Sequence, residues 1–213
     1  HVKRHSFPTR RSSDLGDGFA DLLIGQPDAG FGHVMAVFGG CFTGLGEKVL
    51  TVGGLFEQKT LIGTDVAERL VGGVEDNMIV GGEGDVLYGG GGDDTITVTH
   101  AGFARVDGGG SKNGDTLRIE GVDLTIDHRV QGVEKIELGE GSSVELGHRA
   151  LRRISRTDNT LTITGSGTAN IDLTGHDFEA ATDGEHCVWT DGILTLRVHH
   201  DVEVVLEGVL PCK

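Results

Sequence analysis

A glycine-led unit recurs along residues 63–97 and limits the folds open to this chain. The units begin at Gly63, Gly72, Gly81 and Gly89, so their spacings are nine, nine and eight residues. A short, nearly fixed period predicts a stack of tight turns and very short strands, in which each unit buries its apolar side chain only against its neighbours. Glycine permits the positive φ values and close backbone contacts that such stacking requires.

Each unit carries one large apolar residue and, two positions before it, one acid or amide. We expect the apolar residues to point inward and to form a thin core: Leu70, Ile79, Leu87 and Ile96. We expect the polar residues to lie at the turn edges: Glu68, Asn77, Asp85 and Asp94. Alternate turns share an edge, which predicts that Glu68 faces Asp85 and that Asn77 faces Asp94.

The units resemble the G-G-x-G-x-D-x-U-x repeat of RTX hemolysin-type proteins, over roughly residues 61–98 and more weakly at 108–119. Only the unit at Gly89 matches every position. The resemblance implies a parallel β-roll that binds Ca²⁺ through the four turn-edge residues together with Gly82, Gly84, Gly90 and Gly92. Stacked carboxylates repel without a cation, so calcium would act as a folding switch. The alternative is a flexible Gly/Asp linker with fortuitous spacing.

Residues 16–40 contain an Asp-Gly turn and two apolar runs, Leu22–Ile24 and Val34–Phe38, which predict a hairpin. This stretch resembles the FG-GAP repeat of integrin-type propellers, and the resemblance implies a calcium loop with ligands Asp17, the Phe19 carbonyl and Asp21. Leu15 stands at another ligand position and cannot bind calcium, so we expect an impaired site. An ordinary Asp-Gly turn is the alternative.

Residues 5–15, HSFPTRRSSDL, resemble the translation of a sequencing-adapter oligonucleotide at every position. We therefore leave residues 1–15 out of the fold as a disordered artefact; the alternative is a basic targeting arm. The formal charge of the whole chain is −15. An acidic chain repels nucleic acid and anionic membranes, whereas divalent cations are suitable partners.

After Thr95, short alternating runs separated by Gly, Asn or Asp continue to the end of the chain and predict further strands. One helix is expected at Gly147–Ser155, with Ala150, Leu151 and Ile154 on one face. The predicted fold is all-β: an FG-GAP-like blade fragment at 16–56, an RTX-like roll at 61–98, and a β-rich solenoid or sandwich at 99–213.

Several kinds of chemistry are not indicated. The sequence contains neither H-E-x-x-H nor G-x-S-x-G. Neighbouring His199 and His200 would point to opposite faces of a strand and would not share a metal. The three cysteines have no C-x-x-C spacing, so we expect thiols rather than a disulfide framework. No apolar run approaches the length of a membrane span, and no signal peptide appears.

These observations favour a calcium-binding structural or secretion module, without enzymatic activity, of a large secreted bacterial repeat protein of adhesin type. The RTX resemblance implies type I secretion and calcium-triggered folding at or outside the cell surface, with an extracellular ligand bound by upstream domains. The alternative is the carboxy-terminal secretion module of an RTX protease or lipase whose catalytic domain lies upstream. A third possibility, ligand recognition by an integrin-like propeller, requires more FG-GAP units than this chain has.

Overall fold

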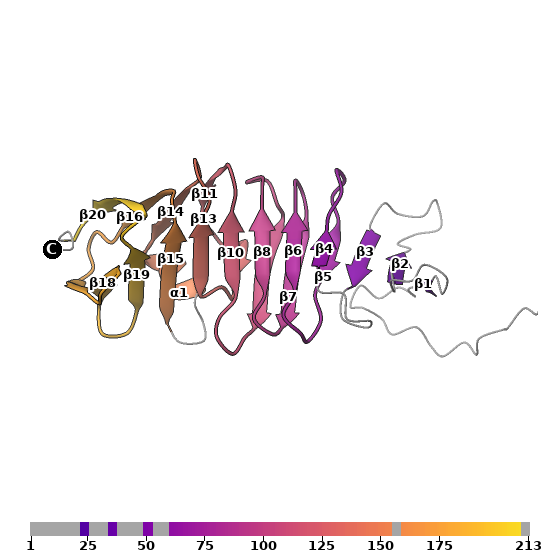
Figure 1. Ribbon diagram of the computed structural model, residues 1–213, viewed down its shortest axis with the longest axis horizontal. Coiled ribbons are helices and arrows are strands. Elements are labelled where there is room, and N and C mark those ends of the chain that lie inside the picture. Colours follow the sequence, from indigo (N-terminus) through magenta and orange to yellow (C-terminus); the bar gives the residue numbers. More distant parts are fainter. Residues whose placement is uncertain (1–21, 26–33, 38–48, 53–59, 155–158, 210–213) are drawn as a thin grey trace, which may run out of the picture.

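The computed structural model describes the backbone of residues 22–25, 34–37 and 49–52, and both backbone and side chains of residues 60–154 and 159–209. In this part the chain forms a parallel β-solenoid of about five turns. Its strands stack side by side along the long axis of the molecule (Figure 1). The fold is mostly β, as predicted.

One side of the solenoid is sheet A, in which β1–β2–β3 run antiparallel and β3 onward run parallel. The antiparallel pairing of β1 with β2 confirms the predicted hairpin. The strands of sheet A are β1 (Leu22–Gly25), β2 (Val34–Val37), β3 (Val49–Val52), β5 (Arg69–Val71), β7 (Val86–Gly91), β9 (Arg105–Gly110) and β12 (Val130–Gln131).

The opposite side is sheet B, which runs along the solenoid and ends in an antiparallel hairpin. Strands from residues 61–98 and strands from the segment after residue 98 pair in this one sheet. The repeat units and the segment after them therefore belong to one stack. Its strands are β4 (Thr60–Ile62), β6 (Met78–Gly81), β8 (Thr95–Val98), β10 (Thr116–Ile119), β13 (Lys135–Leu138), β15 (Thr160–Gly165), β19 (Thr195–His199), β18 (His186–Thr190) and β17 (Glu179–Thr182).

A third side opens after β10, where longer turns leave room for another parallel sheet. Sheet C consists of β11 (Asp123–Thr125), β14 (Ser143–Gly147), β16 (Thr168–Asp172) and β20 (Glu203–Glu207). The carboxy-terminal half is therefore a solenoid, and the sandwich that the sequence left open does not form.

The core includes two long ladders of inward-pointing side chains in register. In sheet A the ladder is Leu70, Leu87, Val106 and Val130, all fully buried. In sheet B it is Leu61, Ile79, Ile96, Leu117, Ile136, Ile163 and Val198, each at most 1% exposed. The inward orientation predicted for the four repeat residues is confirmed. Side chains alternate across each strand, so one apolar residue in two is enough to fill this narrow interior.

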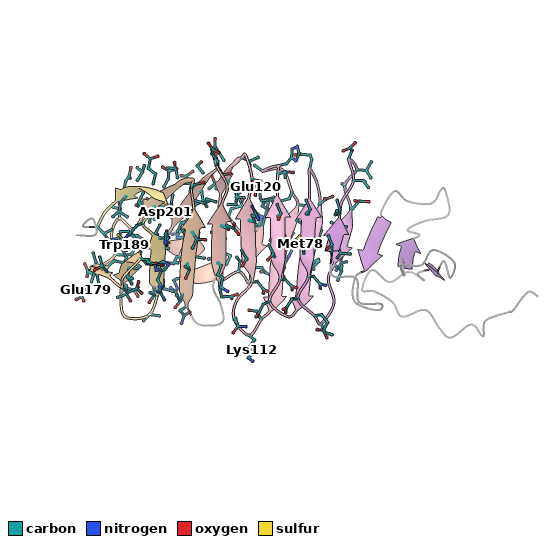
Figure 2. The ribbon with its side chains drawn as sticks, in the orientation of Figure 1. Met78, Lys112, Glu120, Glu179, Trp189 and Asp201 are labelled. Atoms are coloured by element: carbon teal, nitrogen blue, oxygen red, sulfur yellow. The ribbon has the colours of Figure 1, made fainter. Side chains whose placement is uncertain are left out.

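The carboxy-terminal turns cover the end of the core in two ways. Helix α1 (His148–Ile154) packs against β12 and β14, where the next strand of sheet A would lie. Its buried residues are Ala150, Leu151 and Ile154, as predicted. Hairpin β17–β18 adds to sheet B beside β19, and Trp189 in β18 is 1% exposed (Figure 2).

The expectation of free thiols is corrected at Cys187, which is disulfide-bonded. The other two cysteines, Cys41 and Cys212, lie outside the described residues. An odd number of cysteines accommodates one bridge and one thiol, so their number and spacing could not reveal the bond. In the described part of the chain, no helix has the length and apolar character needed to cross a bilayer.

Candidate metal centre

A column of polar side chains runs along one edge of the solenoid, and each member stands two residues before an inward-pointing residue of sheet B. In each step, the backbone N–H of one member donates to the side chain of the member in the following turn. The distances are 2.8 Å for Asn77 to Asp94 Oδ1, 2.8 Å for Asp94 to Asp115 Oδ1, and 3.0 Å for Asp115 to Glu134 Oε2. We name Asn77, Asp94, Asp115 and Glu134 the edge column. None of its members is more than 7% exposed.

The other edge carries the second predicted pair. The N–H of Glu68 donates to Oδ1 of Asp85 at 2.8 Å, and both residues are buried. The structure thus brings together Glu68 with Asp85 and Asn77 with Asp94, the two predicted pairs. The repeat has this geometry because alternate turns return to the same edge.

The remaining oxygens of these side chains differ between turns. Near the start of the roll they accept local N–H groups: Glu68 Oε2 from Thr64 at 2.6 Å, and Asp85 Oδ2 from Gly82 at 2.7 Å. By contrast, Oδ2 of Asp94 and Oδ2 of Asp115 are buried without a hydrogen-bond partner. A buried, unpaired carboxylate oxygen costs free energy, so these two atoms are the ones that gain most from a cation.

Glycines of successive turns lie against the carboxylates of the edge column. A Cβ placed on Gly89 would lie 2.3 Å from Asp94 Oδ2 and 2.2 Å from the carbonyl oxygen of Gly108. A Cβ on Gly108 would lie 2.7 Å from Asp115 Oδ2 and 1.9 Å from the Gly132 carbonyl oxygen. Glycine is required here because backbone and carboxylates of successive turns occupy the space of a side chain. Carbonyl oxygens are thereby held beside the unpaired carboxylate oxygens.

Burial and like charges shift the pKa values of the two carboxylates. Burial raises the pKa of Asp94 to about 6, with further contributions from Asp76 and Asp93. Burial raises the pKa of Asp115 to about 7, and repulsion from Asp94 and Glu134 adds to the shift. Within the described residues, neither carboxylate forms an ion pair that would offset these effects. The carboxyl groups of Asp94 and Asp115 therefore resist ionisation, and a nearby cation would favour their charged forms.

A second, exposed ladder runs outside the edge column. Asp93 donates its N–H to Asp76 Oδ1 at 2.8 Å, and Asp93 Oδ1 accepts the N–H groups of Lys112 at 2.8 Å and Asn113 at 2.7 Å. Hydrogen bonds from the Asn113 backbone and side chain lower the pKa of Asp93. Figure 2 shows Lys112 at the tip of its turn. Asp93 is thus a backbone-binding residue of the stack, although it stands beside Asp94 in the sequence.

The predicted glycine positions are distributed over the turns. Gly82 donates to Asp85, and Gly84 has a φ of 78° and donates its N–H to the Gly102 carbonyl at 3.0 Å. Gly90 and Gly92 also have positive φ values, 113° and 102°. The predicted ligands of the FG-GAP-like loop, Asp17, Phe19 and Asp21, lie outside the described residues.

The continuation of the edge column at Asp115 and Glu134 was not predicted from the sequence. Both residues stand two positions before an inward-pointing residue, Leu117 and Ile136, as Asp94 stands before Ile96. That spacing is the signal that could have identified them. The separations of 21 and 19 residues between successive members broke the period and hid the relationship.

The edge column offers oxygen donors of the kind that calcium binds. Among residues 60–154 and 159–209, no group of three or more His, Cys, Asp or Glu side chains is placed to hold a metal ion. Calcium, however, also accepts backbone carbonyl ligands, and it binds oxygen atoms only. Two unpaired carboxylate oxygens beside stacked glycine carbonyls fit that preference. The residues that would hold calcium are Asp94 and Asp115, with carbonyl oxygens of neighbouring glycines.

Comparison of the chain with protein-family models, curated proteins and solved structures found no match.

Proposed function

We propose that this chain is a calcium-dependent structural module of a large secreted bacterial repeat protein. Its role is to fold into a rigid solenoid where calcium is abundant and to space or present the domains attached to it. The observation that carries the proposal is the pair of buried carboxylates in adjacent turns, Asp94 and Asp115, each with one oxygen that lacks a partner.

The physical argument concerns what holds the turns together. A narrow core of one or two apolar side chains per strand gives limited hydrophobic stabilisation per turn, and each glycine loses much conformational entropy on folding. Repulsion between stacked carboxylates opposes folding further. A cation that binds only the stacked turns adds its binding free energy to the stability of the folded state.

The compartment follows from two considerations. Extracellular calcium modules commonly bind with Kd values of about 10⁻⁴–10⁻³ M, so such a module would stay loose where calcium is scarce and fold where it is abundant. The disulfide at Cys187 supports an oxidising location, since disulfides persist mainly outside the cytosol. Both considerations favour secretion to the extracellular medium or the cell surface.

The test is calorimetric titration of the full chain with CaCl₂, together with the variants Asp94→Ala and Asp115→Ala. We expect heat from the unaltered chain and at least a tenfold weaker affinity for each variant, which corresponds to about 1.4 kcal/mol. The matched control is Asp201→Ala, because the Asp201 side chain is 79% exposed and follows β19 at the carboxy-terminal end of the solenoid. Absence of calcium binding to the unaltered, folded chain would refute the proposal.

A further inference from the structure

Two histidine rings are stacked at the carboxy-terminal end of the solenoid. The imidazoles of His148 and His176 have centroids 3.5 Å apart and planes inclined by 21°. His148 begins helix α1, and His176 lies in the connection between β16 and β17, residues 173–178. The contact therefore joins the connection to the helix that covers the end of sheet A.

The surroundings of the stack contain charges of both signs. His148 Nε2 lies 3.8 Å from Asp191 Oδ2, and the ring of Phe178 meets His148 edge-on at 6.0 Å. Arg152 on α1 acts on His148 as a second cation, and His176 interacts electrostatically with Asp172 at the end of β16. The His148 side chain is only 15% exposed, whereas His176 and Asp172 are exposed, so water screens the charges on the His148 side less than those on the His176 side.

The stacked arrangement is unsuited to binding a metal. The lone pair of an imidazole nitrogen lies in the plane of its ring, and two nearly parallel planes direct their lone pairs alongside one another rather than toward one point. The property that the stack does confer is a requirement on charge. Two neutral rings, or one neutral and one charged ring, can remain in contact, whereas two imidazolium rings repel each other.

We propose that the His148–His176 stack is an acid-sensitive latch, which holds the connection 173–178 on helix α1 near neutral pH and releases it when both rings are protonated. This device is independent of the edge column and of calcium binding. The proposal rests on the contacts and charges of the two rings, and it requires no bound ligand.

The sign of the effect follows from the neighbours of His148. Burial, together with the charges of His176 and Arg152, lowers the pKa of His148 from its ordinary value of 6.5, and Asp191 opposes the shift only in part. A lowered pKa in the folded state means that the latch contributes stability above about pH 6.5, the ordinary value for histidine, and loses it as the pH falls further.

Release would uncover a specific part of the structure. The connection is held by the N–H of Leu173, which donates to the Glu207 carbonyl at 3.0 Å, and by close packing of Thr174, whose Cα would lie 2.4 Å from a Cβ on Gly208. A groove of about 430 Å³ lies between the connection and the end of β20, lined by His176, Asp177, Phe178, Gly208 and Val209. Movement of His176 away from His148 would widen this groove and expose Phe178 and the end of sheet C.

The test is amide hydrogen exchange of the full chain in saturating calcium at about pH 7.5 and about pH 5.5, with protection factors corrected for intrinsic rates. We expect protection of the Leu173 and His176 amides to fall at least about tenfold at the lower pH. Phenylalanine retains an aromatic ring but cannot be protonated. In His176→Phe we therefore expect protection to change by less than about twofold between the two pH values. His128→Phe serves as the control, because the His128 side chain is 83% exposed.

Equal protection at both pH values in the unaltered chain would overturn the proposal, as would an unchanged acid response in His176→Phe. If that variant does not fold, histidine NMR titration of the unaltered chain decides. The proposal then requires the His148 ring to titrate below the ordinary histidine value of 6.5, and titration at or above that value would overturn it.

Discussion

The backbone N–H of Asp94 donates to Oδ1 of Asp115 one turn further along the solenoid, at 2.8 Å, while Oδ2 of each carboxylate remains buried without a partner. The same side chains thus join successive turns through one oxygen and oppose their approach through charge. Substitutions that remove the charge and substitutions that remove the acceptor should consequently have opposite effects.

Asp115→Asn should stabilise the calcium-free protein, because the amide oxygen still accepts the Asp94 N–H whereas the repulsion from Asp94 and Glu134 is lost. We expect the free energy of unfolding in chelator to rise by about 1 kcal/mol, and Asp115→Ala to lower it by about 1–3 kcal/mol, since the alanine leaves a buried N–H unsatisfied. Urea unfolding monitored by circular dichroism measures both. Equal destabilisation by the two variants would contradict this account of the charge.

Acidification should stabilise the calcium-free edge column. The folded-state pKa values of Asp94 and Asp115, about 6 and about 7, are raised above the ordinary 3.8, so the folded state binds more protons than the unfolded state between these limits. The stabilisation is complete below the ordinary value and is lost as the pH rises through about 7. From about pH 7.5 to about pH 5 we expect a gain on the order of 2 kcal/mol in chelator.

The pH experiment is best done in the His176→Phe background, which removes the opposite response of the latch. Thermal melts at a series of pH values give the result. In saturating calcium the gain should disappear, because the cation competes with the protons. A melting temperature in chelator that falls steadily with acidification in this background would be inconsistent with buried, proton-binding carboxylates.

Gly90→Ala should be severely destabilising. Gly90 has a φ of 113°, and a Cβ there would lie 2.2 Å from the Gly73 carbonyl oxygen. We expect a loss of about 2–4 kcal/mol from strain and displaced backbone. Gly110→Ala in the same strand pair is the matched control, because a Cβ at Gly110 meets nothing within 4 Å. Comparable losses in the two variants would show that stacking does not depend on the glycine contact.

Leu117→Ala should lower the free energy of unfolding by about 2–5 kcal/mol, because Leu117 is fully buried in the sheet B ladder and its truncation leaves a cavity. Met78→Ala is the control: Met78 is 51% exposed on the outer face of sheet B, as Figure 2 shows. A change below about 1 kcal/mol is expected there. Chemical denaturation in saturating calcium measures the difference.

The sequence predicted the parts of this structure that depend on local spacing. The repeat position that Leu87 and Ile96 share predicted that both side chains point inward, as they do. The shared face of Ala150, Leu151 and Ile154 predicted α1. The third sheet was not predicted, since its strands pair residues 20 or more positions apart, such as Asp123 with Ser143. Asp115 and Glu134 escaped notice for the same reason: turn length changed while the register of the stack did not.

The His148–His176 contact could not be predicted either. Its residues are separated by two strands of the solenoid, β15 and β16, and they meet only because the connection 173–178 returns over α1. No periodicity relates them. The disulfide at Cys187 could not be predicted from the sequence either, since three widely spaced cysteines do not indicate which two approach each other.

The most direct test of the central claim is amide hydrogen exchange at Asn77, Asp94 and Asp115, whose N–H groups donate to the edge column, in chelator and in saturating calcium at about pH 7.5. Calcium-dependent stacking predicts that protection at these three amides rises by about 100-fold or more with calcium, and that Asp115→Ala abolishes the rise. High and equal protection with and without calcium would contradict the account, because the turns would then stack without the cation.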